Sequence, residues 1–163
     1  MIGLWITLGL IVAIATFFSW TIIHELCHLA ALRLVKAPLV RYKIVPYPHK
    51  YDGKFYWGRI TYMLEEPLDK KQQVWVSYAP RVADYVGIWF LVIFTCFTSF
   101  NFTNFLIVVF LFGSVVDLFV GSLGISPSSD LKRYSNSNTK WMNRVTQMIS
   151  VFVGFFFALV WCL

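Results

Sequence analysis

Hydrophobic residues occur along this chain in four long runs that polar segments separate. The runs cover residues 2–35, 74–97, 102–123 and 141–163, and each is long enough to cross a bilayer, which takes about 20 apolar helical residues. The first run exceeds that length, so we expect a tilted, kinked or protruding helix. The pattern predicts an all-α polytopic membrane protein with about four transmembrane helices in a single domain, residues 1–163.

The segment between the first two runs has a different pattern. In residues 40–63, β-branched and aromatic residues flank Asp52-Gly53, a turn dipeptide. This arrangement predicts a small β-hairpin or sheet at the membrane surface after the first helix. Residues 64–73 are mostly polar and contain Pro67, so we expect them to form a linker.

The composition agrees with a membrane protein and excludes several other classes. With 58% hydrophobic and 13% charged residues, the chain is far more apolar than an ordinary soluble domain. The first run has no basic segment before it and no small-residue cleavage pattern, so we expect it to stay in the mature protein. The three cysteines are far apart in apolar segments, which indicates no disulfide framework.

The basic residues predict the orientation of the helices. They gather between the first and second runs (Arg33, Lys36, Arg41, Lys43, Lys50, Lys54, Arg59, Lys70 and Lys71) and between the third and fourth (Lys132, Arg133 and Lys140). The turn between the second and third runs has none. Because cytoplasmic loops carry the excess of basic residues, both termini are expected outside the cytoplasm. No aromatic-basic motif of a nucleic-acid binder accompanies the net charge of +6. A compact, cysteine-poor chain of this kind fits a bacterial plasma membrane.

His24, Glu25 and His28 form an HExxH motif inside the first run. On a helix of about 3.6 residues per turn, the two histidines lie one turn apart on the same face and can reach one metal ion. In zinc hydrolases with this motif, the glutamate is not a ligand and takes a proton from the metal-bound water. The pattern predicts a Zn²⁺ site with His24 and His28 as ligands and Glu25 as the catalytic base. Two buried histidines held by polar partners are the alternative.

Catalytic zinc usually keeps three protein ligands, so a further ligand is expected downstream. Asp117 and Asp130 are the main candidates. If the third run enters the membrane near Phe102, Asp117 lies roughly 22 Å along it at about 1.5 Å per residue, a depth comparable with that of His28. Asp130 follows a Ser-Pro-Ser-Ser segment beyond the run, where an acidic residue most often caps a turn. Asp117 is therefore the preferred third ligand, and Asp130 is the alternative.

Other polar and small residues near these candidates have simpler explanations. Asp84 is a weaker candidate because Arg81 lies one turn earlier, and an ion pair at the membrane interface accounts for both. Asp117 could pair inside the bundle with a lysine or with Ser114 rather than bind metal. The small residues around Asp117 are expected to let another helix approach closely: Gly113, Ser114, Gly121 and Gly124.

Three segments resemble the site-2 protease group of intramembrane zinc metalloproteases, above all its small zincin peptidase relatives. Residues 24–28, His-Glu-Leu-Cys-His, match the zinc motif in full. Residues 77–84, Ser-Tyr-Ala-Pro-Arg-Val-Ala-Asp, are loosely similar to the segment with a glycine-proline step that opens the next core span. Residues 113–118, Gly-Ser-Val-Val-Asp-Leu, resemble the small-residue segment that ends in the third ligand. The asparagine-proline and aspartate-glycine pattern of the larger proteases is absent, since Leu118 follows Asp117.

The resemblance implies hydrolysis of a peptide bond in or near a transmembrane segment of a membrane protein or peptide substrate. A helical substrate hides its backbone in hydrogen bonds, so it must be unwound and held extended, and an exposed strand edge does this by strand addition. The β-like region from Tyr42 to Tyr62 is the expected substrate-binding region. A noncatalytic metal-binding membrane protein, such as a chaperone, immunity or interaction factor, is the competing class. A metal transporter is less favoured, because it needs further ligands along a path across the bilayer.

Overall fold

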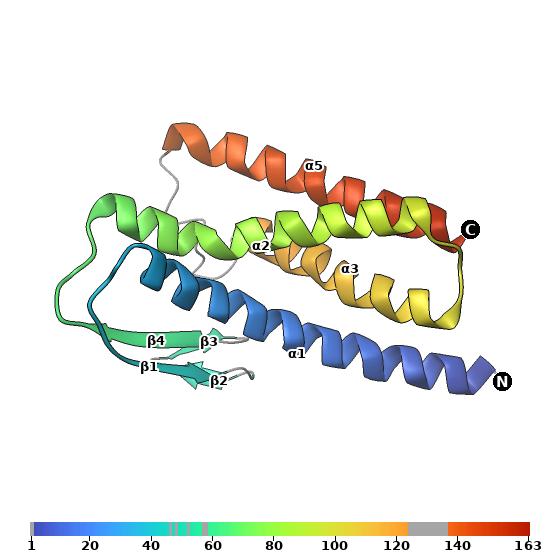
Figure 1. Ribbon diagram of the computed structural model, residues 1–163, viewed down its shortest axis with the longest axis horizontal. Helices are drawn as coiled ribbons and strands as arrows, with labels where there is room; N and C mark the ends of the chain where they lie inside the picture. The colour runs from blue at the N-terminus through green and yellow to red at the C-terminus, as the bar shows by residue number, and fades with distance from the viewer. Residues whose placement is uncertain (1, 46, 48, 52, 57–58, 124–136) are drawn as a thin grey trace.

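The protein is a bundle of four long helices with a small β element after the first. The computed structural model describes residues 2–45, 47, 49–51, 53–56, 59–123 and 137–163. The helices are α1 (Ile2–Leu34), α2 (Lys70–Phe97), α3 (Phe102–Leu123) and α5 (Ser137–Cys162), shown in Figure 1. Each has a stretch long and apolar enough to cross a membrane. The predicted fold class of a multi-pass membrane protein with four spans is confirmed.

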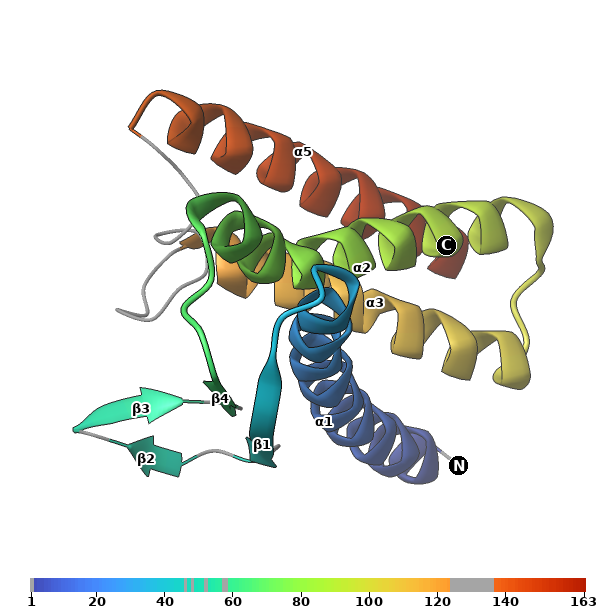
Figure 2. The same cartoon turned by 60° about the vertical axis from the view of Figure 1, so that its left-hand side comes forward.

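The connections between the helices lie at the two ends of the bundle. Both termini and the α2–α3 turn lie at one end, whereas the strands lie beside the far end of α1 (Figure 1). The α2–α3 connection is held by Asn101, whose side chain accepts a hydrogen bond from the Asn104 backbone N–H at 2.8 Å. α1 packs on α2 and α3, and α5 packs on their other side (Figure 2).

Two antiparallel strand pairs follow α1. β1 (Leu39–Val45) pairs with β4 (Arg59–Leu64), and β2 (His49–Tyr51) pairs with β3 (Lys54–Tyr56). Gly53 has a φ of 72°, a backbone conformation that glycine adopts without a steric penalty, and it lies in the turn between β2 and β3. The predicted hairpin after the first helix is confirmed, and it lies alongside the end of α1 (Figure 1).

Two predicted helix starts differ from the structure. α2 begins at Lys70, within the segment predicted as a linker, because Asp69 and Gln72 form a capping box. The Gln72 backbone N–H donates to Asp69 Oδ1 at 2.8 Å, and the Asp69 N–H donates to Gln72 Oε1 at 3.0 Å. These bonds satisfy N–H groups of the first turn, so polar residues extend the helix beyond its apolar part. α5 likewise begins at Ser137, before the apolar run.

α1 and α3 are in close contact where Trp20 packs on Gly113. A Cβ atom added at Gly113 would overlap the Trp20 indole. Trp20 is 6% exposed, and its Nε1 donates to the Phe110 carbonyl at 2.6 Å. Gly87 of α2 admits the Ser114 side chain at the same level, where an added Cβ would lie 2.7 Å from Ser114 Cβ. The prediction that small residues near Asp117 allow close helix approach is thus confirmed at Gly113.

Hydrophobic side chains fill two separate regions of the bundle. The first is formed by α2, α3 and α5 (Ile88, Leu91, Val108, Val115, Leu118 and Ala158). The second lies where the end of α1 meets the start of α2 (Ala31, Leu32 and Val76), with Leu39, Tyr62 and Leu64 of the strands packed against it. The second region fixes the β1–β4 pair against the helices near the HExxH motif.

We expect the replacement Gly113→Val to destabilise the bundle by about 1–3 kcal/mol, since the added side chain must displace the Trp20 indole. Thermal unfolding of the detergent-solubilised protein measures the effect. Gly9→Val is the matched control, because a Cβ at Gly9 meets no atom within 4 Å. Equal stabilities of the two variants would contradict this account of the α1–α3 contact.

Candidate metal centre

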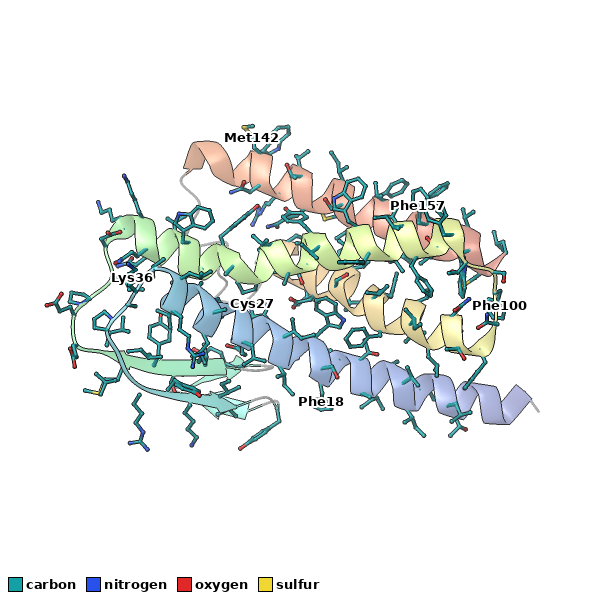
Figure 3. The ribbon with its side chains drawn as sticks, in the orientation of Figure 1. Phe18, Cys27, Lys36, Phe100, Met142 and Phe157 are labelled. Carbon is teal, nitrogen blue, oxygen red and sulfur yellow. The ribbon has the colours of Figure 1, made fainter. Side chains whose placement is uncertain are left out.

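The HExxH motif lies on the part of α1 that faces the other helices. Glu25 and His28 are buried, with 7% and 8% of their surfaces exposed. The rings of His24 and His28 face one another edge to face, with their centroids 5.2 Å apart. Figure 3 labels Cys27, which marks this turn of α1 between the strands and α2. The helix therefore presents both imidazoles to the same region of the bundle, as the spacing predicted.

Asp117 of α3 meets His24 directly. Its Oδ2 lies 2.8 Å from His24 Nδ1. Because a carboxylate accepts hydrogen bonds, the imidazole donates through Nδ1–H. The contact joins residues 93 positions apart, and the same separation relates Trp20 to Gly113 one turn earlier on each helix. The structure thus brings the preferred third ligand to the motif, and its role as a ligand stays a prediction.

His28 is oriented by the backbone of α2. Its Nδ1 lies 2.7 Å from the Val76 carbonyl oxygen, which can only accept a hydrogen bond. Pro80, four residues after Val76, lies inside the helix and has no N–H to donate to that carbonyl. The carbonyl is therefore accessible to His28. A histidine that donates through Nδ1 has its lone pair on Nε2, the arrangement by which proteins orient metal-binding imidazoles.

Arg81 links the two aspartates of α2 and α3. Its NH1 donates to Asp84 Oδ2 at 2.8 Å and to the Asp117 carbonyl oxygen at 3.2 Å, and it lies 3.8 Å from Asp117 Oδ2. The predicted pairing of Arg81 with Asp84 is confirmed. Arg81 and Asp84 are 5% and 1% exposed and lie between packed helices. Gly121 makes room for this, since a Cβ there would overlap the guanidinium.

The structure does not describe two of the remaining candidates, and a third has another partner. Asp130 and Gly124 fall outside the described residues. Ser114, considered as a partner of Asp117, donates its hydroxyl instead to the Leu111 carbonyl at 2.6 Å. Sequence reasoning missed the contact of Arg81 with Asp117. A proline followed by an arginine within an apolar run is the signal that could have indicated it, since both residues are costly inside a membrane helix.

A cavity of about 420 Å³ lies between β4 and the start of α2. Its lining combines apolar and polar side chains (Tyr62, Leu64, Leu68, Gln73 and Ser77). Ser77 directly follows Val76, the residue whose carbonyl accepts from His28. Through Ser77, the cavity borders the turn of α2 that holds Val76.

The donor chemistry of the cluster suits zinc, which takes imidazole and carboxylate ligands. The described side chains do not form a preformed metal site, however. Among the residues that the structure describes, no three His, Cys, Asp or Glu side chains are placed to hold one ion. The Asp117 carboxylate instead contacts the His24 ring itself. The residues thus match zinc in the type of ligand, and Asp117 is in hydrogen-bond contact with His24.

Comparisons with known proteins identified no relative with a similar cluster. No family model, curated protein or solved structure matches the chain. The functional interpretation therefore depends on the residues of this chain and their contacts.

Proposed function

We propose that the protein is an intramembrane zinc metalloprotease that hydrolyses peptide bonds in or near transmembrane segments of membrane proteins. The observation that carries the proposal is the 2.8 Å contact between His24 and Asp117. It joins an HExxH motif on one apolar helix to a carboxylate on another, within segments long enough to cross a membrane. Ionisable side chains within membrane-spanning helices are energetically costly, and they usually belong to functional sites.

In this proposal His24, His28 and Asp117 hold the ion, and Glu25 is the general base. Zinc, when bound, supplies the Lewis acidity that activates water and polarises a carbonyl group. Glu25 is adjacent to His24 in the chain and 7% exposed, so its carboxylate is shielded from bulk solvent. It accepts the proton from the attacking water and returns it to the leaving amine. The bond from His28 to the Val76 carbonyl keeps that imidazole in one orientation.

The strand pair and its neighbouring cavity support a peptide substrate held in an extended form. The β1–β4 sheet has two strands, so each strand has one edge without a strand neighbour in the described part of the chain. An extended peptide pairs with such an edge through its backbone, and adjacent pockets take alternate side chains. The cavity lined by Tyr62 and Ser77 borders the turn of α2 whose Val76 carbonyl accepts from His28, and it suits that role. Tyr62 belongs to the expected substrate-binding region.

The strand end of the bundle is assigned to the cytoplasm, and the protein to a bacterial plasma membrane. Basic residues concentrate on the segment that contains the strands, as in cytoplasmic loops. The termini and the α2–α3 turn, which has no basic residue, share the opposite end (Figure 1). Water then reaches the site from the cytoplasmic side.

The second candidate function is that of a noncatalytic metal-binding membrane protein, such as a chaperone, immunity or interaction factor. The direct His24–Asp117 contact favours this function, because a carboxylate that orients an imidazole is typical of metal-binding sites in general. The two functions differ at Glu25, because a binding protein has no use for a general base. A metal transporter needs further ligands along the bilayer and is the least supported class.

Glu25→Gln is expected to retain zinc and to lower cleavage by at least about 100-fold, because the amide cannot accept the proton. The assay incubates purified protein with a library of synthetic transmembrane peptides in detergent and identifies products by mass spectrometry. Zinc content of the same preparations is the control for binding. Cleavage by the variant at the wild-type rate contradicts the hydrolytic mechanism.

Asp117→Ala is expected to lose bound zinc, whereas Asp130→Ala is expected to keep about one equivalent per chain, because catalytic zinc usually has three protein ligands and Asp117 is the one near the histidines. Elemental analysis of the purified variants measures both. The two aspartates are matched in chemistry, so each variant is the control for the other. If zinc is lost from the Asp130 variant alone, the assignment of Asp117 is wrong.

A further inference from the structure

We propose that residues 76–84 of α2, which hold none of the predicted ligands, are the positioning element of the site. They act at two points, His28 and Asp117, which belong to different helices. The part that concerns metal affinity rests on the proposed zinc site. The part that concerns the hydrogen bond of His28 is measurable without metal, so the two can fail separately.

The first action comes from Pro80. Inside a helix, each carbonyl normally accepts from the N–H four residues later, which for Val76 is position 80. Proline has no N–H, and its ring also pushes against the carbonyl four residues earlier. The Val76 carbonyl accepts from His28 Nδ1 at 2.7 Å. Pro80 thus leaves the Val76 carbonyl without its helical donor. The hydrogen bond to this carbonyl then sets which nitrogen of His28 is protonated.

The second action comes from Arg81. Its NH1 contacts both the carbonyl and the carboxylate of Asp117, at 3.2 and 3.8 Å, while Asp84 accepts from the same nitrogen at 2.8 Å. Gly121 is one turn after Asp117, and its lack of a side chain leaves the space that the guanidinium fills. Arg81 therefore holds both the backbone and the side chain of Asp117. Outer residues of this kind typically alter metal affinity by about 10- to 100-fold.

A purely structural role for the segment predicts different results from a positioning role. If Pro80 and Arg81 only pack the helices, replacing them changes stability and leaves the imidazole and the metal affinity as they are. If they position the site, tautomer and affinity change even where stability is preserved. Variants in which only stability changes, or only the tautomer or the zinc affinity changes, separate the two roles.

The first experiment measures the tautomer of His28 by ¹⁵N NMR of histidine-labelled, metal-free protein. The chain has three histidines, so single replacements assign the signals. Wild type is expected to show His28 protonated at Nδ1. Pro80→Ala restores the backbone donor, and we expect a mixture of tautomers together with an unchanged or higher unfolding temperature.

Val76→Ala is the matched control, since it removes a side chain that is 3% exposed but keeps the carbonyl. It is expected to lower the unfolding temperature and to leave the tautomer of His28 unchanged. A Pro80→Ala protein with the wild-type tautomer overturns this part of the proposal. So does a shift of tautomer in Val76→Ala as large as that in Pro80→Ala, because packing rather than the carbonyl then controls the ring.

The second experiment measures zinc affinity in the double variant Arg81→Met/Asp84→Asn. Removing both charges leaves neither partner of the Arg81–Asp84 pair as an unpaired buried ion, and Asp117 keeps its contact with His24, so the unfolding temperature is expected to stay near that of wild type. Zinc affinity is expected to fall about 10- to 100-fold because Asp117 is no longer held. Arg144→Met is the control, since it removes an exposed positive charge from α5 and is expected to bind zinc as wild type does.

Gly121→Ala tests the same contact with every charge retained. Its methyl group takes the space of the guanidinium, and zinc affinity is expected to fall, whether or not the double variant folds. Wild-type affinity in Gly121→Ala, or in a folded double variant, overturns the role of Arg81. Wild-type protein that binds no zinc overturns the proposed function, and the tautomer of His28 then still decides the role of Pro80.

Discussion

The packing of Trp20 on Gly113 is the contact on which the candidate site depends. Two parallel helices can place one residue of each in contact only if their backbones approach closely at the right register, and a glycine allows that approach. Trp20 is one turn before His24 on α1, and Gly113 is one turn before Asp117 on α3. Once the indole is seated and donates to the Phe110 carbonyl, His24 and Asp117 meet one turn later.

α2 provides hydrogen-bond and ion-pair partners for polar groups that lie among apolar helices. In a membrane, polar groups must find partners within the protein, because water is not available to them. Asp84 and Arg81 pair with each other, and Arg81 also contacts Asp117. The Val76 carbonyl, which proline leaves without its helical donor, accepts from His28. Pro80 and Arg81 would each be unfavourable in an isolated apolar helix. Here the carbonyl that Pro80 leaves free contacts α1, and Arg81 contacts α3.

The strands and the cavity place the site beside an accessible surface. The end of α1 packs with Leu39, Tyr62 and Leu64 of the β1–β4 pair, so the turn that holds the motif lies close to a sheet edge. The cavity at the start of α2 opens on the same side. In the proposed protease, this opening is the route for water and substrate. In this bundle α5 lies on the far side of α2 and α3 and leaves that route uncovered (Figure 2).

The sequence by itself determined the four helices, the hairpin and the HExxH face, because apolar runs, turn residues and one-turn spacing are local properties. It misjudged the start of α2, where Asp69 and Gln72 cap the helix, and it missed the contact of Arg81 with Asp117. Only the tertiary structure decided which carboxylate meets His24 and what orients His28. Those contacts depend on how far helices distant in the chain approach and in which register, and no local pattern specifies that.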